Sequence, residues 1–308
     1  MIKIYRKKLN DLRLKKINKT ERGSWILAVG PDEKEVKSLS QSFNLDATIL
    51  EDGLDENEIS RIEKDKADNF YMIMRFPIED DNNEIITMPI LVVITQDNII
   101  TLCKTKNKII DNFLTHNTNF CTTHKTNFLL KIILEIFGTY DLYLSRILKD
   151  IKAKKIKIGN LENKDILFLV QEEETLNNFV SSLFPAINIL EKILSGRYIT
   201  IYEKDKDIME DLVMDSNQTM ELSRAGSRSI KNIREAYSAI LTNELNKIMK
   251  ILTFVTIFLT IPTIVSSIFG MNVALPLEGN PFAFLFVIVI IFLLSALFFG
   301  VIKGKRWI

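Results

Sequence analysis

The chain has 308 residues, with 40 Lys and Arg against 39 Asp and Glu, so its formal net charge is +1. This even balance argues neither for nor against an anionic partner, and the way charge is segregated along the chain is more informative. Two cysteines, Cys103 and Cys121, are typical of a reduced cytoplasmic protein rather than of a disulfide scaffold.

The first 126 residues alternate between strand and helix signals. Strands are expected at 2–5, 24–29, 69–77, 84–95 and 98–104. Pro31 and Asp32 predict the start of a helix that runs to residue 43, and Asp55 predicts the cap of a second, short helix. The alternation predicts an α/β sandwich with a mixed sheet. It contains neither a phosphate-binding loop nor a nucleophile elbow, so an enzyme is the least expected class.

From residue 127 the sequence is helical almost to its end. Two helices are expected over 128–151 and 163–195, with Gly159-Asn160 between them and Gly196 as the stop. A third runs from about residue 204 to 269, with no proline before Pro262. At 1.5 Å per residue it is roughly 100 Å long, far more than the thickness of a membrane. One helix therefore begins in the cytoplasm and becomes a membrane span.

The lower part of this third helix carries an apolar stripe at three- and four-residue spacing. Such a stripe must pack against another surface. Helices of neighbouring copies in a ring, or helices of the same chain, would both serve, and periodicity does not decide between them. The stripe residues are Ile230, Ile233, Tyr237, Ile240, Leu241, Leu245, Ile248 and Leu252.

Two apolar runs without charge, 251–269 and 281–302, are each about as long as a helix that crosses a bilayer. They predict a transmembrane hairpin, because a core helix of a soluble protein normally keeps one polar face. Basic residues flank the hairpin, and no apolar stretch follows the basic N-terminus, so both ends and the N-terminal part are expected in the cytoplasm. The flanking residues are Lys247, Lys250, Lys303, Lys305 and Arg306, with Trp307 as an interfacial anchor; the connecting segment contains only the acid Glu278.

Gly270-Met271-Asn272 closes the first run. Alone, this tripeptide is no more than a helix C-cap. Between a long charged helix and a second span, it resembles the signature of the CorA family of magnesium and cobalt transporters. The preceding NKIMKILTFVTIFLTIPTIVSSIF, the tail KGKRWI and the N-terminal GSWILAVGPDEKEV also resemble that family. Phe269 departs from it, because a Tyr is commoner there, and so does the connecting segment, where some members carry two acids.

The resemblance implies an α+β membrane protein that forms a homopentameric ring in the cell membrane. Its parts would be a cytoplasmic α/β sandwich, a long helical stalk or funnel, and two C-terminal transmembrane helices. The expected division is an α/β domain at 1–126, a helical pair at 127–203, a stalk helix with the first span at 204–271, an external loop at 270–280, a second span at 281–302 and a basic cytoplasmic tail at 303–308.

The resemblance also implies a passive channel for Mg²⁺ uptake, with Mg²⁺ as both substrate and regulatory ligand and no nucleic-acid partner. Mg²⁺ holds its waters tightly, so the neutral oxygens of a ring of Asn272 would bind the hydrated ion at a filter. Gly270 would let the chain leave the helix, and Met271 would set the shape of the filter. The residues expected to line the pore are Asn246, Met249, Leu252, Thr253, Thr256, Thr260 and Thr263, with Met249 and Leu252 as a hydrophobic constriction.

Charged residues outside the spans complete these expectations. Asp211 matches an acidic residue that, in the family, joins a regulatory divalent site between subunits, and an acidic turn of the next subunit would be its partner. Each acidic cluster could otherwise be a solvated face. The turn is Glu79, Asp80 and Asp81; Glu278 would attract cations outside, and Lys303, Lys305 and Arg306 would form a basic collar.

Two alternatives to a magnesium channel remain open. One is a zinc, cobalt or nickel transporter of the same fold, although relatives that move zinc tend to lack the methionine found here as Met271. The other is a membrane-tethered sensor that transports nothing. A separate zinc site could use Cys103, His116, Cys121 and His124, but their spacing matches no structural zinc pattern.

Overall fold

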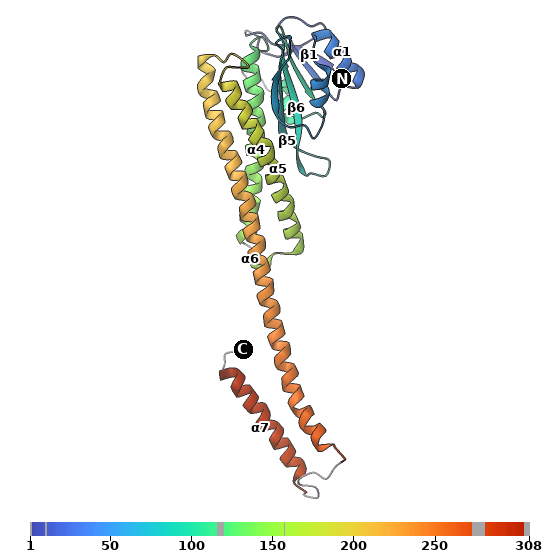
Figure 1. Ribbon diagram of the computed structural model, residues 1–308, viewed down its shortest axis with the longest axis vertical. Coiled ribbons are helices and arrows are strands. Elements are labelled where there is room, and N and C mark those ends of the chain that lie inside the picture. The colour runs from blue at the N-terminus through green and yellow to red at the C-terminus, as the bar shows by residue number, and fades with distance from the viewer. Residues whose placement is uncertain (1, 10, 116–119, 157, 273–280, 305–308) are drawn as a thin grey trace. The chain divides into compact units, whose positions relative to one another are not determined.

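The computed structural model describes residues 2–9, 11–115, 120–156, 158–272 and 281–304, without the side chains of 204 and 302–304. The chain forms two compact units, Met1–Ile233 and Arg234–Ile308. Figure 1 labels their helices and strands.

A seven-stranded mixed sheet organises the first unit, in the order β2-β1-β3-β7-β6-β5-β4. Among the described strands, only β3 and β7 pair in parallel, so the prediction of a mixed sheet is confirmed. β5 and β6 make the longest pairing, from Phe70↔Ile94 to Glu79↔Ile85, and end in a tight turn. The strands are β1 (Ile2–Arg6), β2 (Lys15–Ile17), β3 (Trp25–Val29), β4 (Arg61–Lys64), β5 (Phe70–Glu79), β6 (Ile85–Ile94) and β7 (Ile99–Cys103).

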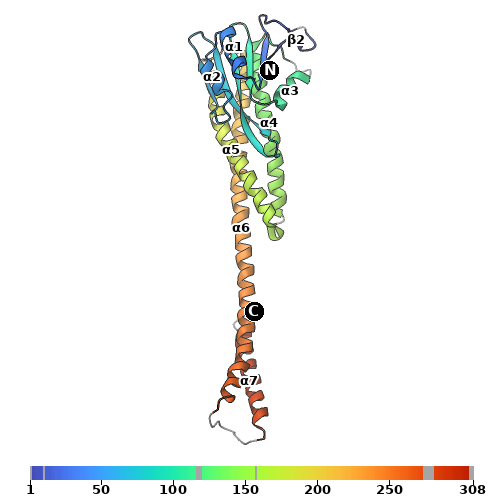
Figure 2. The same cartoon turned by 90° about the vertical axis from the view of Figure 1, so that its right-hand side faces the viewer.

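Helices cover both faces of this sheet (Figure 2). α1 (Glu33–Phe43) and α2 (Ala47–Asp52) bury one face over a core that includes Ile26, Tyr71 and Leu91. On the other face, α4 (Lys125–Ile156) and α5 (Asn163–Leu194) pack on the strands. Helix α3 (Lys108–Thr115) packs on α4, and its Phe113 ring meets Trp25 of β3. There the Trp25 ring meets Phe128 edge-on at 5.1 Å. The predicted α/β sandwich is confirmed.

Helix starts in this unit follow capping chemistry, with one correction to the sequence analysis. Asp32 caps α1 as predicted, because its Oδ1 accepts from the Glu35 N–H at 2.7 Å. The helix expected after Asp55 is absent: this carboxylate accepts from the Asn57 N–H in a turn, at 3.0 Å. The chain must extend at once into β4, which leaves no length for a helix, and Asp46 caps α2 instead.

The predicted continuous third helix is confirmed as α6 (Glu203–Phe269), 67 residues with Pro262 inside it. Its N-terminal part belongs to the first unit. Gly226 allows it to approach α4 and α5 closely, since a Cβ there would lie 3.0 Å from Leu148 Cδ2 and 2.9 Å from Leu176 Cδ1. Ile230 and Ile233 are buried there, so the first part of the apolar stripe packs within its own chain.

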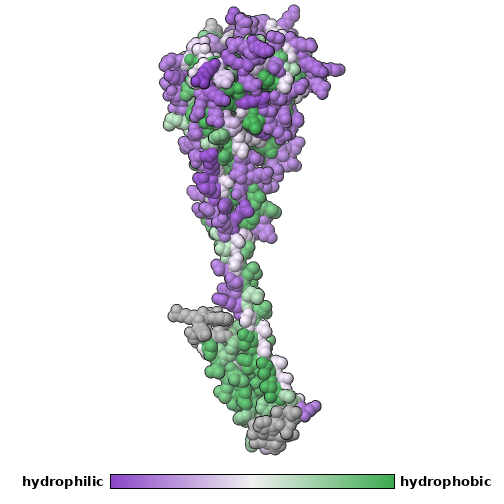
Figure 3. Space-filling view, viewed as in Figure 1, coloured by the Kyte–Doolittle hydropathy of each residue, from purple (hydrophilic) through white to green (hydrophobic). Residues whose placement is uncertain are grey.

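The second unit holds the C-terminal part of α6 and helix α7 (Ala283–Gly304). Among the described residues, these two helices are long and apolar enough to cross a membrane, and only 6% and 0% of their apolar windows are buried. Figure 3 shows the hydrophobic surface gathered on this unit, whereas the first unit is largely hydrophilic outside. The core helix of a soluble protein would instead be mostly buried.

Candidate functional site

Helix α6 ends just before Gly270-Met271-Asn272. The Gly270 N–H still donates to the Ser266 carbonyl at 2.9 Å, and both Met271 and Asn272 are exposed. Gly270 does not adopt a left-handed φ, which corrects the expected reason for this glycine. A Cβ there would meet only the Ser266 and Ser267 carbonyl oxygens of its own helical turn, at 3.3 and 3.7 Å, so the structure does not explain why a glycine stands here.

Four threonines below this tripeptide bond back to their own helix. Each hydroxyl donates its proton to the carbonyl four residues earlier: Thr253 to Met249, Thr256 to Leu252, Thr260 to Thr256 and Thr263 to Leu259, at 2.7–2.9 Å. All four side chains are exposed in the protomer. Because each hydroxyl proton is used in this bond, the oxygen can offer another group only its acceptor capacity. We call these four side chains the threonine ladder.

Helix α7 contacts the other side of α6. The Phe254 ring lies 6.0 Å from Phe298 and 6.3 Å from Phe299. At about 100° per residue, the least exposed residues of the span share the side of Phe254, and the threonine ladder lies on roughly the opposite side. Those least exposed residues are Phe254, Ile261, Pro262, Val265 and Phe269.

Apolar side chains continue the exposed face below the ladder. Met249 and Leu252 are 58% and 57% exposed, and Leu245 and Ile248 are equally uncovered. Asn246, also exposed, is the polar residue expected next to this constriction. Leu245, Ile248 and Leu252 of the apolar stripe are therefore mostly exposed in the protomer, whereas Ile230 and Ile233 are buried.

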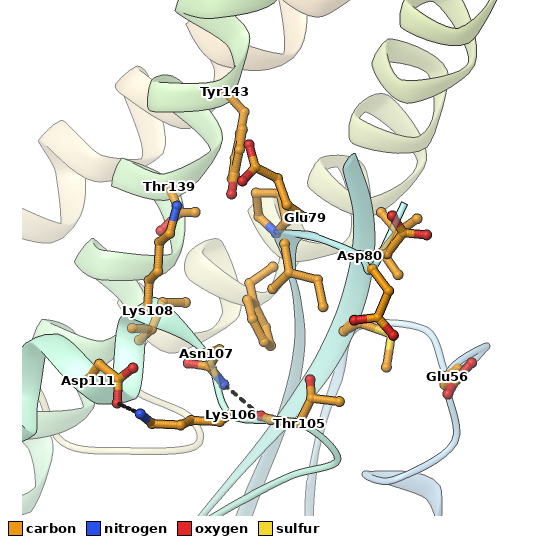
Figure 4. Close-up of a pocket in the computed structure, with 17 residues that line it drawn as sticks. Glu56, Glu79, Asp80, Thr105, Lys106, Asn107, Lys108, Asp111, Thr139 and Tyr143 are labelled. Carbon is orange, nitrogen blue, oxygen red and sulfur yellow. Dashed lines mark hydrogen bonds and ion pairs between the residues drawn. The ribbon is translucent and has the colours of Figure 1, made fainter. Parts of the chain in front are cut away.

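The acidic turn joins β5 to β6 beside a cavity of about 480 Å³ (Figure 4). Glu79 Oε1 accepts from Arg146 of α4 at 2.7 Å. Asp80 Oδ1 accepts from the N–H groups of Asn82 and Glu84, at 2.9 and 2.8 Å, and so closes the turn. Asp81 is exposed.

Asp211 is exposed on α6. Among the described residues of one protomer, no three acidic, His or Cys side chains lie together in a group that could hold a metal ion. The protomer thus does not gather Asp211 and the acidic turn into a metal site.

Comparison with known families supplies the deciding observation. The model of the family described as "CorA-like Mg2+ transporter protein" matches residues 20–305. The chain belongs to this family. The resemblance drawn from the tripeptide and its flanking segments is confirmed.

Relatives of this CorA-family chain extend over nearly its whole length. The Cobalt/magnesium transport protein CorA of Methanocaldococcus jannaschii is 27% identical, covering 92% of this chain and 91% of its own. The Magnesium transport protein CorA of Wolinella succinogenes is 24% identical with the same coverage. The complete structure of the M. jannaschii magnesium transporter covers 100% of this chain and 99% of its own, at 23% identity and a TM-score of 0.85.

A more distant neighbour, the full-length CmaX protein, has a TM-score of 0.77 at 16% identity, covering 99% of this chain and 97% of its own. These likenesses establish the fold: an N-terminal α/β domain, a long helix and two C-terminal apolar helices.

Some residues singled out from the sequence lie outside the described part of the chain. They are Glu278, Lys305, Arg306, Trp307, His116 and the side chain of Lys303. Of the other residues in the possible zinc site, Cys103 and Cys121 are buried free thiols. Burial raises the pKa of Cys103 to about 12, which disfavours the thiolate that would bind zinc.

Sequence reasoning missed two contacts that shape these sites. Arg146 lies within an ordinary helical pattern, and no neighbouring residue in the sequence indicates that it forms an ion pair with Glu79. Phe254 was one apolar residue of many in the first span. The turn was easier to find, because Asp80 followed by Asn82 and Asn83 is a turn signal, and Asn83 has a φ of 61°.

Proposed function

We propose that this protein is a passive channel that admits hydrated Mg²⁺ to the cytoplasm along the exposed face of α6. The threonine ladder is the observation that carries this proposal. Waters bound to a cation point their protons outward, so they need acceptors, and the ladder offers acceptors only. A helix that only anchors a protein in lipid has no use for a polar stripe on the side away from its neighbour.

Asn272 is the proposed filter, three residues beyond the C-terminal end of α6. Its amide oxygen is neutral, so a ring of such oxygens holds the waters of Mg²⁺ without trapping the ion. Met271 would set the width of the ring by packing. An inward-negative potential supplies about 2.3 kcal/mol per charge per 100 mV, and therefore about twice that for Mg²⁺.

Met249 and Leu252 are the proposed gate. Apolar side chains that surround a narrow path can close it by expelling water. Asn246, Thr253, Thr256, Thr260 and Thr263 would line the remaining path.

A ring of copies, a homopentamer in this family-based proposal, would cover the surfaces that one chain leaves open. Leu245 and Ile248 are 62% and 60% exposed on a helix that turns its neighbour α7 to the other side. Parallel α6 helices around an axis would bury this stripe and bring the ladder, the constriction and Asn272 to the centre. Both termini would then lie in the cytoplasm, with Lys303, Lys305 and Arg306 as a basic collar and Glu278 attracting cations outside.

We propose that cytoplasmic Mg²⁺ regulates the gate by binding between subunits. Asp211 of one copy would face the acidic turn of the next, where Asp81 is exposed and Glu79 and Asp80 lie beside it. Unrelieved, these carboxylates repel one another; Mg²⁺ between them would hold the subunits together and the gate closed. A fall in Mg²⁺ would release them.

Mg²⁺ uptake into liposomes that hold the purified protein tests the proposal. We expect a Mg²⁺-sensitive dye inside the liposomes to report uptake for the wild type and at least tenfold less for Asn272→Ala, because each lost contact in the filter costs about 1 kcal/mol and the ring repeats the loss. Phe284→Ala, on the exposed side of α7, is the control and should transport normally.

The outcomes separate the parts of the proposal. Equal uptake by the wild type and Asn272→Ala would keep transport and reject the filter. No uptake by a folded, oligomeric wild type would reject the channel in favour of a tethered sensor.

A further inference from the structure

Glu172, in the middle of α5, has a carboxylate oxygen without a partner. Its Oε2 is buried and, among the described residues, accepts no hydrogen bond. Beside it lies a cavity of about 400 Å³ to which three elements contribute: the β5–β6 turn with Asn83 and Glu84, α4 with Arg146, and α5 with Phe168. The carboxylate thus stands where a hairpin and two helices meet.

The charges around Glu172 are mostly negative. From α4 it faces Asp150 and Arg146, and that guanidinium already binds Glu79. From the turn comes Glu84, whose Oε1 accepts from Gln171 at 3.3 Å. On α5 itself, the neighbouring acids are Glu173 and the exposed Glu174. On α4, Lys154 forms an ion pair with Asp165, and its ammonium lies over the Phe168 ring.

Burial, followed by the charge of Asp150, raises the pKa of Glu172 to about 7, against the opposing effect of Arg146. A solvated glutamate would be ionised throughout the physiological range. This one changes charge within it.

We propose that Glu172 is a proton-operated contact that holds α5 against α4 and the β5–β6 turn, closed when its carboxyl carries a proton and loosened when the proton leaves. A protonated carboxyl brings no charge into the buried position and no longer repels Asp150. When Glu172 ionises, a charge is buried again and Asp150 repels it. The guanidinium of Arg146 offsets this only in part, because it is bound to Glu79. The contact lies within the first unit and does not depend on the proposed transport.

The sign of the pH effect follows from linkage. The pKa of Glu172 is higher in the folded protein than in the unfolded chain, so its contribution to stability is present in acid and is lost as pH rises through about 7. Between pH 6 and pH 8 the loss is at most roughly tenfold in the local opening equilibrium, and less in proportion to the solvent that reaches the group.

Hydrogen exchange measured by mass spectrometry on the full-length protein in detergent micelles tests this contact. Exchange times at pH 6, 7 and 8 are scaled for the intrinsic rate, and peptides over 168–178 and 80–86 are compared. We expect wild-type protection to fall severalfold from pH 6 to pH 8, and Glu172→Gln, which is neutral at every pH, to remain protected.

Two further variants complete the design. Glu174→Gln removes a neighbouring exposed charge and should keep the wild-type pH dependence. Asp150→Asn removes a charge that raises the pKa of Glu172, so the transition should move to lower pH. A wild type whose protection does not change with pH would overturn the proposal. So would an equal fall in Glu172→Gln, or an Asp150→Asn transition that stays in place.

Discussion

At the scale of single residues, the position of one hydrogen atom decides what each threonine of the ladder offers. A valine has nearly the same shape as threonine but lacks the oxygen, and a serine keeps it. Comparing the three separates the acceptor role of the side chain from its packing.

Thr260→Val should slow Mg²⁺ uptake into liposomes by ~2- to 10-fold, since one lost hydrogen bond to a cation's water costs about 0.5–1.5 kcal/mol. Thr260→Ser should restore most of the rate. Equal rates in all three proteins would mean that the hydroxyl serves only its own helix.

Asp80 makes a second prediction at this scale. Its carboxylate accepts two backbone N–H groups of the β5–β6 turn, so Asp80→Ala should lower the free energy of unfolding by about 1–2 kcal/mol. Asp81→Ala, the exposed neighbour, should change it by less than about 0.5 kcal/mol. Thermal unfolding of the two variants measures the difference, and equal losses would show that the turn does not depend on Asp80.

At the scale of elements, α6 depends on a glycine where it crosses α4 and α5. The side chains of Leu148 and Leu176 occupy the space that a larger residue at 226 would need. Gly138 of α4 has open space around it and is the natural comparison.

Gly226→Leu should destabilise the first unit by about 1–3 kcal/mol, because the helices must separate to admit the side chain. Gly138→Leu should instead be neutral or stabilising by up to about 1 kcal/mol, since it removes a helix glycine without a clash. Denaturant unfolding followed by circular dichroism gives both values, and a stable Gly226→Leu protein would show that α4 and α5 yield easily.

Elements with a strong local signal were predictable from the sequence. The long α6 could be predicted from an almost unbroken run without proline or glycine. The apolar part of α6 and helix α7 could be predicted because 251–269 and 281–302 contain no charged residue. Strand β4 was missed because Arg61-Ile62-Glu63-Lys64 has one buried residue, Ile62, and is a strand only through its pairing with β5. The helix misassigned to Asp55 failed for the same reason, since a tertiary demand outweighed a local cap.

Some residues of the candidate site could likewise be predicted from the sequence and others could not. The threonine ladder and Asn272 could be found by helical spacing and by the resemblance to a family. The Arg146–Glu79 pair and the buried oxygen of Glu172 could not, because each joins residues tens of positions apart whose proximity only the fold creates.

At the scale of the whole molecule, the proposed regulation depends on contacts between copies. Asp211→Lys should hold the neighbouring acidic turn by an ion pair in place of Mg²⁺, and so weaken the dependence of uptake on internal Mg²⁺ by severalfold. Glu210→Lys, one residue away and also exposed, is the matched control. Liposomes loaded with graded Mg²⁺ give the comparison, and an unchanged dependence in Asp211→Lys would remove this residue from the sensor.

Any channel in a cell membrane risks leaking protons, and the hydrogen bonds of the threonine ladder affect this risk. Relay along a chain requires groups that accept a proton on one side and release another in turn. Each threonine hydroxyl in the ladder already donates its hydrogen bond to a helix carbonyl. In the proposed channel, these hydroxyls would accept hydrogen bonds from the ion's waters without passing protons along the path. A path built this way would let magnesium enter without its lining helping to discharge the gradient that powers the cell.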